Sequence, residues 1–418
     1  MYFGLPPAAK GFAMQMLMRM PAVETPQVVL TGLPLTVIAG LAFLTVVDLF
    51  AAQAILPSLT RQYEVLPSQM AVAVNASTIG MAVSSLFVAL FNYAIPRRTG
   101  IVCALLLLAI PTVRLAHASG LAEFTALRVI QGLLMACAFS LTLAYLGERT
   151  PARIVATAFA AYIAGNVASN LIGRFMAAAL TDEWGLAAAF YTLAALNVAG
   201  GVLAFISLSG MKLNTDEPVT QPAGTRLAAH LGNPMLRHAF AIGFLILFAF
   251  IGTFSFINFK LVNPPLNVSM SGLGYSYAVF APSIVTTLAA GFAVHRWGTR
   301  RALWMGFGTA AAGLPMVLAS NLPAVLIGMM LIAAGTFFAQ GTITGFVSRA
   351  AHHDRGAASG LYLASYFLGG ITGAALLGRI FESFGWAGTV SGIALALALA
   401  SIFTLAITEI STPAESLK

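Results

Sequence analysis

The fold is decided by an apolar run from about Val28 to Leu59, which contains the stretch Thr45-Val46-Val47-Asp48-Leu49-Phe50-Ala51-Ala52-Gln53. An α-helix needs about 20 apolar residues to cross a bilayer, and this run is longer. A carboxylate well inside a membrane helix costs about 2.5–3.5 kcal/mol to insert, so it normally faces protein or a water-filled cavity. The run therefore predicts a membrane helix in which Asp48 has such surroundings.

The composition of the 418-residue chain indicates a polytopic helical membrane protein. Hydrophobic residues make up 59% of it, charged residues only 8%, and the mean hydropathy is +0.90, whereas a soluble domain carries about 25% charged residues. The net charge of +8 is scattered over short loops and not gathered in the basic patch of a nucleic-acid-binding protein. Cys103 and Cys137 fall in apolar segments and the six His are dispersed, so we predict no disulfide, metal site or cofactor.

Polar residues and Gly/Pro punctuation divide the chain into twelve apolar segments. They cover residues 29–58, 68–94, 100–117, 121–147, 154–180, 186–209, 236–262, 271–294, 300–319, 321–347, 357–381 and 386–409. The longest polar stretch lies between the sixth and seventh segments, so we expect two six-helix halves. The predicted organisation is an N-terminal tail (1–28), a first half (29–209), a linker (210–235), a second half (236–409) and a C-terminal tail (410–418).

The distribution of basic residues predicts which helix ends face the cytoplasm. With the N-terminus inside, the inner loops and tails hold 15 of the 21 Lys and Arg residues, as the positive-inside bias requires. Both termini and the linker are therefore predicted to be cytoplasmic. We expect a monomer in the inner (cytoplasmic) membrane.

The two halves repeat at an offset of 200 residues. Identical residues at this offset include the pairs Thr99/Thr299, Thr142/Thr342, Arg149/Arg349, Tyr162/Tyr362, Gly173/Gly373 and Gly185/Gly385. A constant offset keeps loops and spans in phase, which indicates an internal repeat. Two such halves with the same in–out sense are related by an axis along the membrane normal.

Four segments carry a family resemblance. They are the second-half loop Gly291-Phe-Ala-Val-His-Arg-Trp-Gly-Thr-Arg-Arg301, the fourth-span motif Arg128-Val-Ile-Gln-Gly132, Tyr162-Ile-Ala-Gly-Asn166 and Gly360-Leu-Tyr-Leu-Ala-Ser-Tyr-Phe-Leu-Gly-Gly370. They resemble segments of the major facilitator superfamily, and within it the proton-coupled drug and metabolite exporters of the YnfM-like group. The resemblance extends from about Thr31 to the end of the chain. It implies an all-α membrane protein with twelve helices in two six-helix pseudo-repeats, and a role in proton coupling for the fourth-span arginine.

The first-half counterpart of the basic loop motif is degraded. Phe91 stands where the family has Gly, Ile95 stands where it has Asp, and only Arg97, Arg98 and Gly100 fit the pattern. The charge relay of the inner gate is therefore expected to be weaker in the first half. The residues predicted for gating are Arg97, Arg98, Gly291, Arg296, Gly298, Arg300 and Arg301.

Asp48 and Arg128 are predicted to meet. Asp48 lies about four residues past the midpoint of an outward-running first span, and Arg128 about six residues before the midpoint of an inward-running fourth span. At 1.5 Å per residue, both lie roughly 6–9 Å toward the outside. Arg128 would favour the ionised form of Asp48 and desolvation the neutral form, so a conformational change would load and release a proton. The alternative is a permanent buried ion pair that only fixes helix packing.

Polar and aromatic side chains at helical spacings are predicted to line a central cavity, on spans that line it in the resembled fold. Aromatic walls around a few polar groups suit a moderately apolar ligand. The residues predicted for substrate binding are Gln53, Gln131, Met135, Tyr145, Asn166, Asn170, Phe244, Asn258, Gln340, Tyr362 and Tyr366. Interhelical hydrogen bonds and contact with lipid are the alternatives for these side chains. Arg174 and Arg379 have three alternatives, which are snorkelling, ion pairs at the outer gate and binding of an anionic substrate.

These features predict a secondary active transporter that exports a small organic solute (a drug, sugar or metabolite) in exchange for protons, by alternating access. Two alternatives remain: proton-coupled uptake of an organic acid or sugar, and a transporter-like sensor that moves no solute. An enzyme is not expected, because the spans offer neither paired carboxylates nor a nucleophile–His arrangement. The expected partners are the solute, protons and the lipid bilayer, with no nucleic acid.

Overall fold

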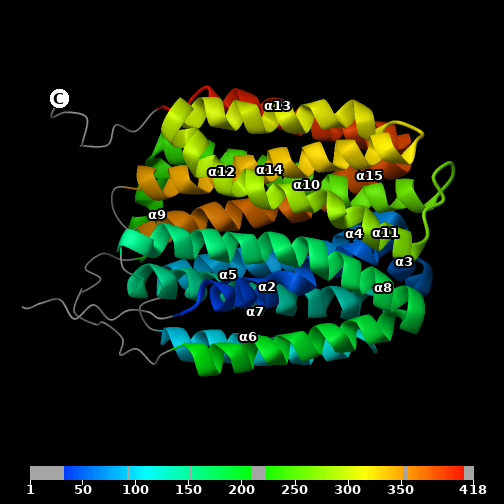
Figure 1. Cartoon of the computed structure of the whole chain (residues 1–418), viewed down its shortest axis with the longest axis horizontal. Helices are drawn as coiled ribbons and strands as arrows, with labels where there is room; N and C mark the ends of the chain where they lie inside the picture. Colours follow the sequence, from blue (N-terminus) through cyan, green and yellow to red (C-terminus); the bar gives the residue numbers. More distant parts are fainter. Residues whose placement is uncertain (1–32, 92–94, 151, 209–222, 352–354, 409–418) are drawn as a thin grey trace, which may run out of the picture.

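The computed structural model describes residues 33–91, 95–150, 152–208, 223–351 and 355–408. In these ranges the chain forms long helices that run side by side, and no strand occurs among them (Figure 1). The predicted tails (1–28 and 410–418) and the first part (210–222) of the predicted linker (210–235) lie outside the described residues.

The first half contains the helices α2 to α8. They are α2 (Leu35–Ala54), α3 (Leu56–Tyr63), α4 (Pro67–Asn75), α5 (Ser77–Phe91), α6 (Arg97–Leu115), α7 (Leu121–Arg149) and α8 (Ala152–Ser207). Within α8 the chain leaves the helical conformation at Gly185, whose φ is 84°. Glycine adopts this left-handed region without strain because it has no Cβ. Helix α8 therefore contains the predicted fifth and sixth spans.

The second half contains the elements α9 to α15. They are α9 (Ala223–Gly232), α10 (Pro234–Val262), α11 (Met270–Ser276), the 3₁₀ turn η2 (Tyr277–Phe280), α12 (Ala281–Trp297), α13 (Thr299–Val317), α14 (Leu322–Ala350) and α15 (Arg355–Thr404). Helix α15 is broken at Gly385, whose φ is 65°, so it contains the predicted eleventh and twelfth spans.

The repeat predicted from the sequence is present in the packing of the helices. The break at Gly185 recurs 200 residues later at Gly385. Gly165 of α8 lies so close to α2 that a Cβ would be 2.0 Å from the carbonyl oxygen of Ala39, and Gly369 of α15 lies equally close to that of Phe244 on α10. Each half thus joins its first and fifth spans by backbone contact at a glycine.

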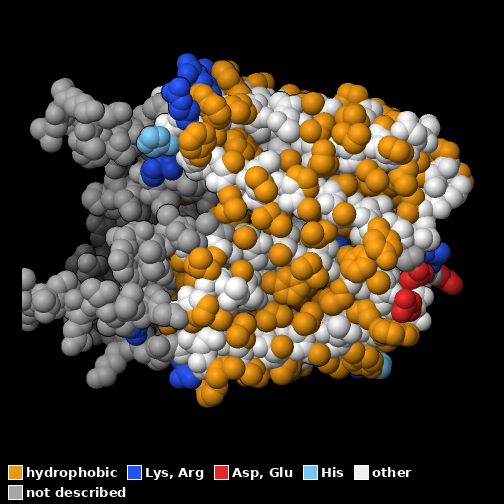
Figure 2. Space-filling view, in the orientation of Figure 1, with side chains coloured by type: hydrophobic (Ala, Val, Ile, Leu, Met, Phe, Trp, Pro, Cys, Tyr) orange, Lys and Arg blue, Asp and Glu red, His pale blue; other side chains and the backbone are white. Residues whose placement is uncertain are grey.

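The structure is consistent with twelve membrane crossings. Nine helical stretches within the described residues are long and apolar enough to span a bilayer. Dividing two of them at Gly185 and Gly385, and adding the less apolar, 19-residue α13, gives the predicted number. Apolar side chains are spread over the described part of the face seen in Figure 2, as expected for a surface in contact with lipid.

The two halves lie side by side, with α6 and α13 at opposite edges of the bundle (Figure 1). We call the left-hand side in Figure 1, where α9 lies, the termini end, and the other side, where α3 and α11 lie, the distal end.

Three predicted spans are interrupted in the structure. The first is divided between α2 and α3 at Ile55, the second between α4 and α5 at Ala76, and the eighth among α11, η2 and α12. The first break has a clear cause, since Pro57 has no N–H to donate to the carbonyl of Gln53 one turn earlier. That carbonyl is left free to accept a hydrogen bond from another helix.

Candidate functional site

Asp48 is buried inside the first half, with only 1% of its surface exposed. Its Oδ1 accepts hydrogen bonds from the Thr112 hydroxyl at 3.2 Å, from Gln131 Nε2 at 3.2 Å and from Asn197 Nδ2 at 3.5 Å. These donors come from α6, α7 and the second part of α8. Its Oδ2 has no hydrogen-bond partner. The carboxyl group thus has one oxygen held by neutral donors and one oxygen that is free.

The Thr112 hydroxyl is the centre of this cluster. It accepts hydrogen bonds from Gln131 Nε2 at 2.6 Å and from Asn197 Nδ2 at 3.0 Å. Its single hydrogen is within reach of two acceptors, Asp48 Oδ1 at 3.2 Å and the Leu108 carbonyl at 2.7 Å. A hydroxyl donates only one hydrogen bond at a time. Thr112 is therefore able to turn between the carboxyl group and its own helix.

Arg128 contacts Asp48 differently from the prediction. Its Nη1 donates to the main-chain carbonyl of Asp48 at 3.2 Å and to Gln131 Oε1 at 2.7 Å. Its Nε donates to the Val74 carbonyl at 2.8 Å, and its Nη2 to the Ser77 hydroxyl at 3.1 Å. Although both lie in the described part of the chain, the Asp48 and Arg128 side chains form no direct ion pair. Gln131 stands between them.

Close packing of α5 against α7 brings Arg128 to the break between α4 and α5. A Cβ on Gly132 would lie 1.8 Å from the Ser77 carbonyl oxygen, and a Cβ on Gly80 would lie 2.0 Å from that of Val129. Real side chains do not tolerate such distances, so both positions require glycine. The spacing Arg128-x-x-x-Gly132 thus combines the arginine with the small residue that lets it reach the neighbouring helix.

The Asp48 cluster does not line the cavity between the halves in this conformation, although Gln131 was predicted to bind substrate. Val46, Leu49 and Phe50 are the α2 residues that line the cavity. At 3.6 residues per turn, Asp48 points to the opposite side of the helix. On α7, the predicted substrate residues Gln131, Met135 and Tyr145 are buried and do not line the cavity, whereas Phe139 does.

The cavity itself lies between the two halves and has a volume of about 40 Å³, enough for a few water molecules. Its wall is mostly aliphatic and aromatic. The polar residues in the wall are Asn166, Thr336, Gln340 and Tyr366, three of which were predicted from the sequence. The Oδ1 of Asn166 has no hydrogen-bond partner. A drug-sized ligand needs several hundred Å³, so the halves must separate before one enters.

Hydrogen bonds between the halves close the interface on the distal side of this cavity. Asn258 Nδ2 donates to the Gln53 carbonyl at 2.7 Å, which is the carbonyl left free by Pro57. Asn75 Nδ2 donates to the Ser255 hydroxyl at 3.1 Å, and Gln53 Nε2 donates to Asn75 Oδ1 at 2.8 Å. Gln53 and Asn258, predicted to bind substrate, therefore join the halves in this conformation.

Arg174 of α8 is enclosed in the same interface and has no exposed surface. Its Nε donates to Asn170 Oδ1 at 2.7 Å and its Nη2 donates to Gln53 Oε1. Its Nη1 has no hydrogen-bond partner. Aromatic rings surround its Cζ at centroid distances of 4.6 Å (Tyr277), 5.4 Å (Phe280), 5.7 Å (Phe254) and 5.8 Å (Phe50).

The other predicted substrate residues do not line the cavity in this conformation. Met135 and Tyr145 are buried in the packing of the first half. Phe244 packs beside the Phe248 ring, with centroids 6.4 Å apart, and Tyr362 accepts a hydrogen bond from the Thr344 hydroxyl at 3.2 Å. Their helical spacing is that of packing positions as well as of cavity positions, which is why the sequence pattern alone did not separate the two.

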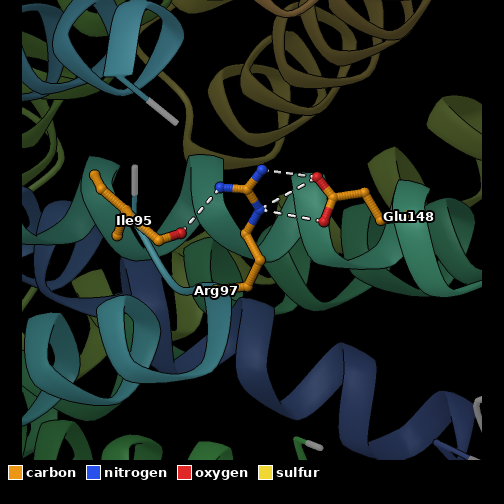
Figure 3. Close-up of polar contacts among 3 residues, drawn as sticks. All are labelled: Ile95, Arg97 and Glu148. Carbon is orange, nitrogen blue, oxygen red and sulfur yellow. Dashed lines mark hydrogen bonds and ion pairs between the residues drawn. The ribbon is translucent and has the colours of Figure 1, made fainter. Parts of the chain in front are cut away.

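The predicted first-half gate contains an ion pair despite the degraded motif (Figure 3). Arg97 Nη2 lies 2.8 Å from Glu148 Oε1, Arg97 Nε is 3.2 Å from both carboxylate oxygens, and Nη1 donates to the Ile95 carbonyl at 3.1 Å. Arg98 donates to the Phe205 carbonyl at 2.7 Å. Glu148, at the end of α7, thus provides a carboxylate for a loop that lacks the expected Asp.

The second-half loop is built differently. Gly291 and Arg296 belong to α12, Gly298 connects α12 to α13, and Arg300 and Arg301 lie in the first turn of α13. Arg300 Cζ lies 4.9 Å from the centroid of the Trp304 ring. The basic residues of this loop therefore lie at the termini end of the second half.

Sequence reasoning missed several residues of these clusters. They are Asn75, Ser77, Thr112, Glu148, Asn197, Ser255 and Tyr277. Most are single polar residues in otherwise apolar spans, which is a signal that was available. Hydropathy does not indicate which face of a helix such a residue occupies, so their partners were not predictable.

Comparisons with known proteins agree with this architecture. The family model of the Major Facilitator Superfamily matches residues 38–281 and 261–418. The chain is 29% identical over 365 residues to the inner membrane transport protein YnfM of Escherichia coli (strain K12), covering 87% of each chain. It is 26% identical over 359 residues to the uncharacterized MFS-type transporter YybF of Bacillus subtilis (strain 168), covering 86% of this chain and 89% of YybF.

Solved structures show the same fold at low sequence identity. A bacterial homologue of the human lysosomal transporter Spinster, in an inward-facing and occupied conformation, superposes with a TM-score of 0.71 at 13% identity, covering 89% of this chain and 96% of that chain. A point mutant of the nucleoside transporter NupG superposes with a TM-score of 0.70 at 14% identity, covering 90% of this chain and 99% of that chain. The chain is therefore a multi-pass membrane transporter of the Major Facilitator Superfamily.

Proposed function

We propose that this transporter exports a small organic solute across the cytoplasmic membrane in exchange for protons, by alternating access to the cavity between its halves. The observation that carries the proton coupling is the environment of Asp48. A buried carboxyl group with one free oxygen, surrounded by neutral hydrogen-bond donors, is a site where a proton can be added without breaking an ion pair.

Protonation of Asp48 would change the partners of its neighbours. In the ionised state, Oδ1 accepts hydrogen bonds from Thr112, Gln131 and Asn197. Gln131 also accepts a hydrogen bond from Arg128, so it connects the guanidinium group to the carboxylate. A neutral carboxyl group attracts these donors less, so the Thr112 hydroxyl would turn to the Leu108 carbonyl. Protonation thus weakens the hydrogen bond from Gln131 to Asp48. Gln131 could then reorient, and its hydrogen bond to Arg128 would change.

Arg128 connects this change to the interface between the halves. It binds the carbonyl of Val74 at the end of α4, and the next residue, Asn75, donates to Ser255 of the second half. A shift of Arg128 would move this end of α4 and loosen the bond to Ser255. In this proposal protonation of Asp48 weakens the closed distal interface. Solute transport and proton transport are coupled because both depend on whether this interface is open.

We infer that the termini end faces the cytoplasm. On the face seen in Figure 2, Lys and Arg side chains lie mostly toward the termini end, and the visible Asp and Glu side chains lie at the distal end. This distribution supports the positive-inside orientation. With that orientation, the distal interface closed by Gln53, Asn75 and Asn258 is the outer gate.

The test is solute-induced proton movement in proteoliposomes, with drugs, sugars and organic acids as solutes. The matched variants are Asp48→Asn, which cannot take up a proton, and Glu183→Gln, which removes an exposed carboxylate of α8. Antiport predicts that solute added to one side drives protons to that side in the wild type and in Glu183→Gln, but not in Asp48→Asn.

Other outcomes would contradict parts of this proposal. Movement of protons with the solute, and not against it, would establish symport in place of export. Proton-coupled flux that persists in Asp48→Asn would move the coupling site elsewhere. Absence of flux with every solute would favour the alternative of a sensor.

A further inference from the structure

We propose that Arg174 recognises the anionic group of the transported solute, and that the solute is an organic carboxylate with an aromatic or aliphatic body. The inference rests on the proposed transport function, because the halves must separate during transport for Arg174 to become accessible. The residue stands apart from the Asp48 cluster and forms no hydrogen bond with it.

The first observation is an uncompensated charge. Arg174 is completely buried, and no Asp or Glu in the described part of the chain forms an ion pair with it. Its two well-formed hydrogen bonds go to the side-chain oxygens of neutral amides, Asn170 and Gln53, and its further polar neighbour is the Tyr277 side chain. A guanidinium group in such surroundings has lost its hydration without gaining a counter-ion, which leaves it with a strong attraction for an anion.

The second observation is the unused donor. Nη1 of Arg174 has no hydrogen-bond partner, whereas Nε and Nη2 are occupied. The two occupied donors fix the plane of the guanidinium group. An arginine held in this way is pre-organised for a carboxylate, because its planar fork presents N–H groups in the geometry that a carboxylate accepts.

The third observation is the division of the cage between the halves. Asn170 and Gln53, which hold the guanidinium, belong to the first half together with Arg174 itself. Three of the surrounding rings, Phe254, Tyr277 and Phe280, belong to α10 and η2 of the second half. When the halves separate at the distal end, the rings leave and the oriented guanidinium remains. The aromatic faces thus substitute for an anion while the interface is closed.

The cage adjoins the central cavity. Phe50 lines the cavity, and the centroid of its ring lies 5.8 Å from Arg174 Cζ. Phe250, another cavity residue, lies one turn before Phe254 on α10, with its ring centroid 4.7 Å away from that of Phe254. A solute whose apolar body occupies the cavity would therefore reach Arg174 with a carboxylate at its distal end. Arg174 lies on this route for flux in either direction.

The test is a binding measurement on the full chain in lipid nanodiscs with matched pairs of probes. The pairs are phenylacetate and phenylacetamide, indole-3-acetate and indole-3-acetamide, and hexanoate and hexanamide. The variants are Arg174→Gln, Arg174→Lys and, as control, Arg379→Gln, which removes an exposed arginine of α15. We expect the wild type and Arg379→Gln to bind at least one carboxylate about tenfold more tightly than its amide. In Arg174→Gln this preference falls to about one, and in Arg174→Lys it is intermediate because lysine keeps the charge and loses the fork.

Two results would overturn the inference: no carboxylate binds better than its amide, or the preference survives in Arg174→Gln. If Arg174→Gln does not fold, the preference of the wild type and its reduction in Arg174→Lys decide. Because binding is measured without flux, the proposed function is tested separately. A preference that depends on Arg174 in a protein that moves no protons supports this inference and contradicts proton-coupled export. Proton-coupled flux of amides, with no preference for carboxylates, supports the proposed function and contradicts this inference.

Discussion

Arg128 reaches Asp48 through the main chain, with Nη1 of the guanidinium 3.2 Å from the Asp48 carbonyl oxygen. The link between the two side chains is Gln131, which accepts from Arg128 at 2.7 Å and donates to Asp48 at 3.2 Å. An amide placed between opposite charges fixes their relative positions and prevents direct contact between the guanidinium group and the carboxylate. A direct pair would hold the carboxylate ionised more firmly, so this arrangement suits a carboxylate that has to accept a proton.

Replacing Gln131 with Leu should uncouple the two charges. The substitution leaves Arg128 Nη1 without its side-chain acceptor and Asp48 Oδ1 without one of its donors. Loss of partners for buried polar groups costs about 1–3 kcal/mol, so the free energy of unfolding in mixed micelles should fall by that amount. Solute-driven proton movement should fall more strongly than solute exchange.

The control for Gln131→Leu is Met135→Leu, a volume-conserving change one turn further along α7. It should cost less than about 1.5 kcal/mol and leave proton movement intact. Equal effects of both substitutions on proton movement would mean that Gln131 acts only through packing.

Gly132→Ala should disrupt the contact that brings Arg128 to α4 and α5. Its Cβ would lie 1.8 Å from the Ser77 carbonyl oxygen, so backbone has to move. We expect the free energy of unfolding to fall by about 1–3 kcal/mol. We also expect proton coupling to be lost. Gly147→Ala on the same helix is the control, because its nearest neighbour would be the Phe159 ring at 3.9 Å. A stable, fully coupled Gly132→Ala protein would show that this close approach is dispensable.

Pro57→Ala should weaken the closure of the distal interface. Alanine supplies an N–H that competes with Asn258 for the Gln53 carbonyl. The measurement is the rate at which a membrane-impermeant maleimide labels Ser255→Cys, in a background in which Cys103 and Cys137 are replaced by Ala. Pro57→Ala and Asn258→Ala should both raise the rate several-fold.

Pro315→Ala is the control for this measurement, because Pro315 lies inside α13 at the edge of the bundle. It should leave the labelling rate unchanged. If Asn258→Ala raises the rate and Pro57→Ala does not, the free carbonyl of Gln53 is not what keeps Asn258 in place.

The ion pair of Arg97 and Glu148 should contribute modestly to stability. The Glu148 side chain is 39% exposed, and pairs of this kind are worth about 0.2–1 kcal/mol, less at high salt. A double-mutant cycle with Arg97→Ala and Glu148→Ala should give a coupling energy in this range. Arg97→Ala should cost more than Glu148→Ala, since Arg97 also donates to the Ile95 carbonyl. Strict additivity of the two substitutions would show that the pair is not formed.

Much of the fold was predictable because membrane helices must be long and apolar. The twelve apolar segments and the repeat at 200 residues follow from hydropathy and punctuation alone, and Gly185 and Gly385 mark equivalent breaks. The break after Ala54 was also available in the sequence, since Pro57 removes one helical hydrogen bond. Its consequence, the bond from Asn258 to Gln53, was not, because it depends on how the halves meet.

The proximity of the candidate residues was predicted, and their hydrogen-bond partners were not. Asp48, Arg128 and Gln131 lie together as expected from their depth, but on the side of α2 that faces away from the cavity. Thr112 and Asn197 complete the cluster from the third and sixth spans, which the resemblance did not place near Asp48. Periodicity gives the spacing along one helix, and the rotation of that helix about its axis comes from packing against the others.

The central claim is that Asp48 carries the transported proton. The most direct measurement is the release of protons from purified protein in weakly buffered detergent when a transported solute is added, followed with a pH indicator. If Asp48 carries the proton, the wild type and Glu183→Gln release protons, and Asp48→Asn that still binds the solute releases none. Release of as many protons by Asp48→Asn as by the wild type would contradict it.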